Sequence, residues 1–213
     1  MALEFSDSVE KVSSNSAQRL LETAEQIFAQ SGFVGTRVDE IARAAAINKR
    51  MIYYHFRSKE GLYQAVLEKN LVPLLEMSRN LLREGLHPAE MYRRLLDSYF
   101  DFLASHRLYV RLISWEILGR NSRLSSLGMR RQTFDEVVKY FEQAQHEGAL
   151  RADVEVRDVV MAGLMLCFCY FSQMQFMQDF YPCDLDDPEQ FARWKASVLA
   201  LILEGSRLQG CSR

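Results

Sequence analysis

The sequence predicts an all-α protein, with a three-helix helix-turn-helix domain at the N-terminus and a larger helical domain after it. Its 213 residues include only 10 glycines and 4 prolines, while residues that favour helices are plentiful. Apolar residues recur at helical spacing along most of the chain, and no segment has a convincing strand pattern. Residues 36–62 contain two short helical patterns separated by a tight turn. Together these observations indicate about nine helices.

The composition is that of a soluble globular protein. Hydrophobic residues make up 48% and charged residues 25%, and the formal net charge is −2. The longest apolar run lies within residues 159–171, which is shorter than the roughly 18 residues of a membrane span, so we expect a buried helix and no membrane partner. The four cysteines lack disulfide spacing, which favours reduced thiols in a cytoplasmic protein. No motif indicates an enzyme, a cofactor or a metal.

The first helix is expected to begin near Ser16 and to run to Gln30. Its apolar residues fall on one face: Leu20, Leu21, Ala24, Ile27 and Phe28. Gly32 can end it, because glycine tolerates the left-handed conformation found after a helix C-terminus. Residues 1–15 are polar and lack a hydrophobic period, which predicts a flexible arm.

Residues able to accept a hydrogen bond from a first-turn N–H precede the next three helices. Thr36 can cap the second helix, Asn48 the third and Ser58 the fourth. The third is short, and Ile52 is its main inward anchor together with a phenylalanine one turn later. We therefore assign residues 16–62 to a helix-turn-helix domain and residues 63–213 to a second domain.

The helix-turn-helix region carries a local excess of positive charge. No acidic residue occurs from Ile41 to Lys59, where five residues are basic. The first 71 residues as a whole contain nine basic and nine acidic side chains, so the case for a nucleic-acid partner depends on local clustering. A solvated basic helix face is the simpler alternative. The adjacent tyrosines at 53 and 54 favour DNA, since their hydroxyls can donate to phosphate oxygens.

Beyond residue 75 the apolar pattern predicts longer helices. Pro88 suits a first helical position, and Asp187 followed by Pro188 suits the start of the last helix. The other expected helices cover roughly 107–120, 123–147, 155–179 and 188–207.

Several motifs between Ser16 and Leu67 occur in a fixed order. They are the Ala24/Phe28 helix, the Ser31-Gly32-Phe33 turn, Thr36 before Val38-Asp39-Glu40-Ile41-Ala42, Ile47-Asn48-Lys49, Ile52-Tyr53-Tyr54-His55-Phe56 and Ser58-Lys59-Glu60. In this arrangement the stretch resembles the DNA-binding domain of the TetR family of transcriptional regulators. The resemblance implies a homodimer of all-helical subunits, whose N-terminal helices bind DNA and whose remaining helices bind a ligand and dimerise.

The resemblance also implies roles for individual residues. The DNA-binding set that it gives is Thr36, Arg37, Asn48, Lys49, Arg50, Met51, Tyr53, Tyr54, His55 and Lys59. Residues 36–37 and Lys59 correspond to phosphate contacts, residues 49–51 to the base-facing start of the recognition helix, and residues 53–55 to groove-wall contacts. Arg50 and Met51 stand where the family often carries small or hydroxyl residues, so an operator sequence does not transfer.

Residues 159–181 are apolar on all sides, which requires cover on every face. One side can face the subunit's own core and another a partner subunit. With the apolar stripe of the last helix, this predicts a four-helix dimer interface. The predicted interface residues are Val160, Leu164, Phe168, Phe191, Trp194, Val198, Leu201 and Ile202. A fully monomeric core is the alternative.

Aromatic and sulfur-containing residues are dense in the second domain, where they could line a pocket for a mainly apolar effector. The candidate effector residues are Tyr99, Phe102, Trp115, Glu116, Phe134, Cys167, Tyr170, Phe171 and Met174. Ordinary core packing is the alternative for each of them.

The sequence thus predicts a regulator of transcription, most simply a repressor. It would bind a palindromic double-stranded operator as a homodimer and be released by a small-molecule effector. Two alternatives stay open: a constitutive architectural DNA-binding protein without an effector, and a helical enzyme in which the helix-turn-helix is incidental.

Overall fold

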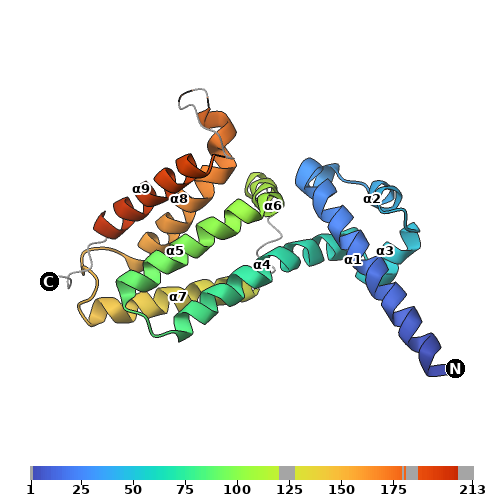
Figure 1. Ribbon diagram of the computed structural model, residues 1–213, viewed down its shortest axis with the longest axis horizontal. Helices are drawn as coiled ribbons and strands as arrows, with labels where there is room; N and C mark the ends of the chain where they lie inside the picture. Colours follow the sequence, from blue (N-terminus) through green and yellow to red (C-terminus); the bar gives the residue numbers. More distant parts are fainter. Residues whose placement is uncertain (1, 120–127, 179, 181–186, 206–213) are drawn as a thin grey trace. The chain divides into compact units, whose positions relative to one another are not determined.

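In the computed structural model the chain is all-helical, as predicted (Figure 1). The structure describes residues 2–119, 128–178, 180 and 187–205. Within those residues it has nine α-helices: α1 (Ala2–Gly35), α2 (Val38–Ala44), α3 (Lys49–Phe56), α4 (Lys59–Arg83), α5 (Pro88–Ser105), α6 (Arg107–Leu118), α7 (Gly128–His146), α8 (Val156–Met177) and α9 (Pro188–Gly205).

Packing divides the chain into two compact units. Unit 1 contains the chain up to Asn70 and the part of α6 from Arg111 onward. Unit 2 contains Leu71–Val110 together with α7, α8 and α9. The division therefore falls inside α4 and α6, and differs from the boundary at residues 62–63 that the sequence suggested.

α1 begins at Ala2, so the segment expected to be a flexible arm is helical in the structure over residues 2–15. This segment contains no glycine or proline, and nothing in it prevents the packed turns from extending toward the N-terminus. A missing hydrophobic period shows that a segment has no apolar face to bury, but it does not exclude a helix. At the other end, α1 is kinked at Gly32, whose φ of 66° is the left-handed conformation expected there.

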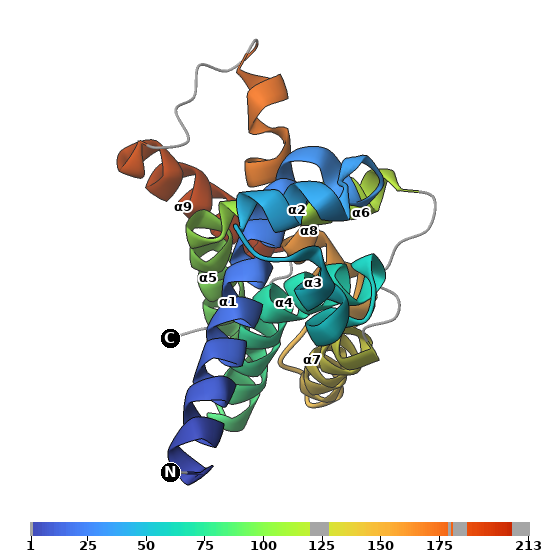
Figure 2. The ribbon, with the colours of Figure 1, turned by 90° about the vertical axis from the view of Figure 1, so that its right-hand side faces the viewer.

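α1, α2 and α3 pack around one apolar core, and Figure 2 looks onto α2, α3 and the connection between them. Large buried side chains of this core are Leu20, Phe28, Ile41 and Ile52, joined by Leu62 and Tyr63 from the start of α4. Two predicted caps are confirmed. Asn48 Oδ1 accepts a hydrogen bond of 2.9 Å from Arg50 N, and Ser58 Oγ accepts one of 3.0 Å from Gly61 N.

The cap predicted at Thr36 is wrong. Its side chain is buried, and its hydroxyl donates to the Gly32 carbonyl over 2.7 Å. Arg37 occupies the N-cap position of α2, without a side-chain cap bond. The kink at Gly32 directs the carbonyl of that residue to the Thr36 hydroxyl, which therefore fastens the turn after α1 instead of the start of α2.

In unit 2, α5 contacts both α8 and α9, and α8 also contacts α7 and α9 (Figure 1). Pro88 and Pro188 are the first residues of their helices, as predicted, and Asp187 Oδ1 accepts a 2.9 Å hydrogen bond from Glu189 N. The helix expected over 123–147 is present as α7 from Gly128; its residues 123–127 lie outside the described part of the chain.

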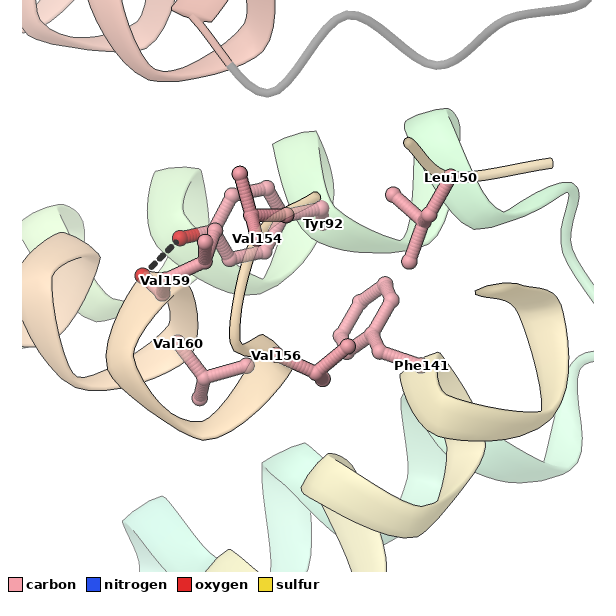
Figure 3. Close-up of a pocket in the computed structure, with 7 residues that line it drawn as sticks. All are labelled: Tyr92, Phe141, Leu150, Val154, Val156, Val159 and Val160. Atoms are coloured by element: carbon pink, nitrogen blue, oxygen red, sulfur yellow. Dashed lines mark hydrogen bonds between the residues drawn. The ribbon is translucent and has the colours of Figure 1, made fainter. Parts of the chain in front are cut away.

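α5 and α8 approach closely where a tyrosine faces a glycine. The Tyr92 hydroxyl donates to the Val159 carbonyl over 2.7 Å, as Figure 3 shows. A Cβ added to Gly163 would lie 2.5 Å from the Tyr92 hydroxyl oxygen, so the crossing requires a residue without a side chain at this position. Beside it lies an apolar cavity of about 20 Å³.

α8 is only in part the buried helix that the sequence predicted. Its stretch Val156–Gln173 has a mean hydropathy of 1.2 over 18 residues, so its length and composition alone would suit a membrane span, yet only 39% of it is buried. The helix packs against α5, α7 and α9, and its first turn carries Arg157 and Asp158. One face of α8 thus belongs to the core of unit 2, and the other is exposed.

Candidate nucleic-acid interface

The turn between α2 and α3 sets the direction of the recognition helix. Ala46 has a φ of 52°, which is uncommon for a residue with a side chain. The backbone N–H of Ala46 donates to Arg43 O and that of Ile47 to Ala42 O, each over 3.0 Å. The carbonyls at the end of α2 are thereby paired, and Asn48 starts α3 immediately afterwards. The turn is short and is held by these hydrogen bonds, so it keeps α3 in a defined orientation.

α3 exposes most of its polar side chains. Ile52 is its one fully buried anchor, while Lys49, Arg50, Tyr53 and Tyr54 are exposed. Tyr54 is 73% exposed, which is unusual for an aromatic ring and leaves its hydroxyl free to reach outward. Cations and tyrosine hydroxyls on the outer surface of a short capped helix are groups that donate to phosphate oxygens and base edges.

Other members of the predicted DNA-binding set are more constrained. Arg37 and Asn48 are exposed, and Met51 is half-buried. His55 is half-buried, and its Nε2 lies 3.0 Å from Ser16 Oγ, so it joins α3 to α1. Lys59 Nζ lies 4.3 Å from the centroid of the Phe33 ring. Thr36 is buried, which places its side chain within unit 1 instead of on the predicted phosphate-contacting surface.

An acidic residue lies beside the start of the recognition helix, and sequence reasoning missed its role. Lys49 Nζ is 2.8 Å from Asp39 Oδ1 in the first turn of α2. Lys49 donates this hydrogen bond to the Asp39 carboxylate, and the bond, together with the negative charge of Asp39, raises the pKa of Lys49 above the ordinary lysine value. The pair is ten residues apart in sequence, so no local spacing rule would have identified it. Arg43 and Arg57 are also exposed near these helices and were not included among the predicted contacts.

Two predicted effector residues belong to unit 1. The Trp115 ring lies 3.0 Å from where a Cβ of Gly32 would be, and its indole N–H donates to Ala29 O over 3.2 Å. Glu116 is buried and accepts a 2.8 Å hydrogen bond from the Tyr63 hydroxyl. These contacts fasten the end of α6 to α1 and α4 within the helix-turn-helix unit. Both residues therefore have a structural role in unit 1, and a contact of either one with an effector stays a prediction.

The remaining candidate effector residues are mostly core residues. Phe102, Cys167, Tyr170 and Phe171 are buried, and Tyr99 is half-buried. Phe134 is half-buried, with the Arg157 guanidinium 5.5 Å from its ring centroid. The side chain of Met174 lies outside the described part of the structure.

The cavity beside α8 holds none of these residues. Its lining is Tyr92, Phe141, Leu150, Val154, Val156, Val159 and Val160 (Figure 3). A volume of about 20 Å³ is close to that needed by a single water molecule, so the cavity as it stands is too small for an effector.

Polar groups are nevertheless present inside unit 2. Burial raises the pKa of Tyr99, and it raises the pKa of both Tyr109 and the Cys167 thiol to about 12. The charge of Arg130 acts against this rise at both tyrosines. Thr133 is buried, and its hydroxyl has no hydrogen-bond partner among the described residues. Such groups ordinarily find a partner.

The predicted dimer residues divide between the core and the surface. Val160, Phe168 and Val198 are buried within the subunit, so their assignment to an interface is wrong. The error arises because the sequence of an all-apolar helix does not indicate which of its sides faces the subunit's own core. Of the others, Leu164, Phe191, Trp194 and Ile202 are half-buried and Leu201 is exposed. The exposed apolar residues of α8 are instead Met161, Met165, Leu166, Phe176 and Met177.

Comparison with known proteins places both halves of the chain in one family. Residues 20–66 match the family model for bacterial regulatory proteins of the tetR family, and residues 88–202 match a tetracyclin repressor-like C-terminal domain. The HTH-type transcriptional repressor NicS of Pseudomonas putida is 28% identical over 192 residues, which cover 88% of this chain and 91% of NicS.

Two solved structures share the fold. The ketosteroid transcriptional regulator KstR2 of Mycobacterium tuberculosis superimposes with a TM-score of 0.68 at 23% identity, over 89% of this chain and 93% of KstR2. The transcriptional regulator FadR of Bacillus subtilis, in complex with stearoyl-CoA, gives a TM-score of 0.69 at 16% identity, over 88% and 97% of the two chains.

Proposed function

The chain belongs to the TetR family of bacterial regulatory proteins, and from that premise we propose that it is a cytoplasmic, ligand-responsive repressor. It binds a palindromic operator as a homodimer. The observation that carries the proposal is the surface of α3, where Lys49, Arg50, Tyr53 and Tyr54 are all exposed on a helix anchored by one buried isoleucine. The repressor NicS, similar over nearly the whole chain, supports the direction of regulation.

At DNA, α3 enters the major groove with its N-terminal end toward the bases. Arg50 is the residue best suited to direct readout, because a guanidinium can donate two hydrogen bonds to a guanine edge. Tyr53 and Tyr54 lie one turn further on and contact the backbone that borders the groove. Arg37 supplies a phosphate contact from the start of α2, while Asn48 serves mainly as the cap of α3.

Dimerisation uses the exposed apolar side of α8. Met161, Met165 and Leu166 lie within two turns on that side, and Phe176 continues it toward the C-terminus of the helix. α9 adds an exposed side made mainly of small residues with Leu201. A second copy covers this surface without displacing the subunit core. The two recognition helices then read two half-sites, whose spacing follows the DNA turn.

An effector binds in unit 2 and favours a conformation that no longer fits the operator. The unpartnered hydroxyl of Thr133, the half-buried Tyr99 of α5 and the buried Tyr109 of α6 support a small, mainly apolar ligand with at least one polar group. The stearoyl-CoA complex of Bacillus subtilis FadR offers a precedent in a protein of the same fold. Coupling to DNA requires only that the ligand bind one conformation more tightly than the other.

Matched arginine variants test the DNA-binding part of the proposal. Operator fragments are first selected from a random pool, and affinity is then measured by fluorescence anisotropy. We expect Arg50→Ala to lose about 5- to 150-fold in affinity, the equivalent of one paired base contact. Arg131→Ala on α7 removes an arginine whose side chain is 90% exposed, and serves as the control. Equal affinities for both folded variants would contradict the assignment of α3.

A constitutive DNA-binding protein is the second candidate, and the small size of the cavity favours it. Such a protein would bind its operator equally well in the presence of any metabolite. Repeating the selection with metabolite mixtures decides between the two, since release of the operator by any fraction supports an effector.

A further inference from the structure

The ion pair between Asp39 and Lys49 joins the two helices of the helix-turn-helix at the surface proposed to meet DNA. Lys49 is the first residue of α3, and its Nζ is 2.8 Å from Asp39 Oδ1. Both side chains are largely accessible, at 43% and 64% respectively. A carboxylate in this place opposes the approach of a phosphate backbone, so its presence calls for a physical reason.

Stability does not supply that reason. Ion pairs between exposed side chains add little to folding, because water screens them and two long side chains lose freedom. Asp39 could also serve the positive end of the α2 helix dipole, but Glu40 stands beside it in the same first turn. The first turn of α3, by contrast, contains no acidic residue and begins with two cations. Cations are unfavourable at the positive N-terminal end of a helix, and the Asp39 carboxylate offsets them.

We propose that Asp39 is a specificity-determining residue, which holds Lys49 toward the base edges and withholds it from phosphates. This inference rests on the proposed function, since it assumes that α3 reads DNA. On random DNA, the paired Lys49 adds no net charge and gains no phosphate contact. On the operator, its remaining N–H groups donate to an acceptor in the groove while Asp39 keeps the side chain extended.

Asp39→Asn and Glu40→Gln form a matched pair for the test. Each removes one negative charge from the same turn of α2, but only Asp39 is bonded to Lys49; Glu40 has no ion pair with any residue that the structure describes. Affinities of the full-length variants are measured for the selected operator and for a scrambled duplex across a salt series. A net-charge effect would act on both variants and on both duplexes alike.

We expect Asp39→Asn to bind the scrambled duplex about fivefold more tightly near 0.15 M salt, with a salt slope steeper by about 0.9, as for one added phosphate contact. Operator affinity changes less, so the ratio of operator to scrambled affinity falls. Glu40→Gln leaves that ratio and the slope unchanged. Equal ratios for the two variants would overturn the proposal, because Asp39 would then act only as a charge.

Lys49→Gln completes a double-mutant cycle. If Asp39 acts through Lys49, adding Asp39→Asn to Lys49→Gln leaves the slope on scrambled DNA unaltered. If Asp39→Asn changed the salt slope as much in the Lys49→Gln protein as in the wild type, the carboxylate would act independently of Lys49. That result would refute the inference. Failure of the wild-type protein to prefer any sequence is a different outcome, which would remove the proposed function itself.

Discussion

α3 and α8 show opposite relations between folding and function. α3 has eight residues and one fully buried anchor, so four of its other seven side chains are exposed. α8 has 22 residues, apolar on nearly all sides, and the same residue types serve the subunit core and the exposed surface. Where folding and binding require different chemistry, a sequence separates them. Where both require apolar groups, the two sets of residues are separated only by which side of the helix faces the core.

The largest expected effect tests the exposed side of α8. Met165→Glu places a charge on a surface that we propose to be buried by a second copy, at a cost of several kcal/mol. We expect a monomer by light scattering and a loss of operator affinity of about 100-fold or more, since one half-site must suffice.

Met129→Glu on α7 is the control for this change. Met129 is 43% exposed and Met165 44%, so the two substitutions alter similarly exposed side chains on different helices. A dimer that survives Met165→Glu would remove α8 from the interface and weaken the contrast with α3.

The anchor of α3 should have the next largest effect. Ile52 is fully buried, and Ile52→Ala leaves a cavity in the core of unit 1. We expect the free energy of unfolding to fall by about 2–5 kcal/mol in urea titrations followed by circular dichroism. Met51→Ala, at a half-buried neighbour, should cost less than about 1 kcal/mol. Similar losses for both would mean that α3 is held differently from what its packing indicates.

Glu116 separates a structural role from an effector role. Glu116→Ala removes the acceptor of the Tyr63 hydroxyl bond, and we expect a loss of about 1–3 kcal/mol in unfolding free energy. Ile117→Ala, at the exposed next position, should change little. A Glu116→Ala protein of unaltered stability with an altered effector response would support the effector role predicted from the sequence.

The smallest effect concerns the cap of α3. Asn48→Ala should cost about 1 kcal/mol, because Arg50 N loses its acceptor. Asn48→Asp keeps an acceptor and should retain stability, while its added charge weakens DNA binding. Thermal denaturation measures the loss of stability, and anisotropy on the same samples measures the loss of DNA affinity. Parallel losses of DNA affinity in both variants would show that Asn48 is chiefly a DNA contact.

Local rules predicted helix starts in both units. Ser58, Asn48 and the prolines at helix starts were identified because a cap depends on residues within one turn of each other. Thr36 was misassigned because its partner, the Gly32 carbonyl, is made available by a backbone kink. Residues 2–15 carry no hydrophobic period, so their pattern does not predict the helix that they form in the structure.

By itself, the sequence determined the all-helical fold, the order of its helices and the polar surface of α3. Those properties follow from spacing and from the short range of capping interactions. Tertiary structure decided the partners that lie far apart in the chain: Asp39 with Lys49, Trp115 with Gly32, and Glu116 with Tyr63. It also decided which side of α8 is buried. No local pattern encodes these outcomes, because each depends on how helices distant in sequence come to lie against one another.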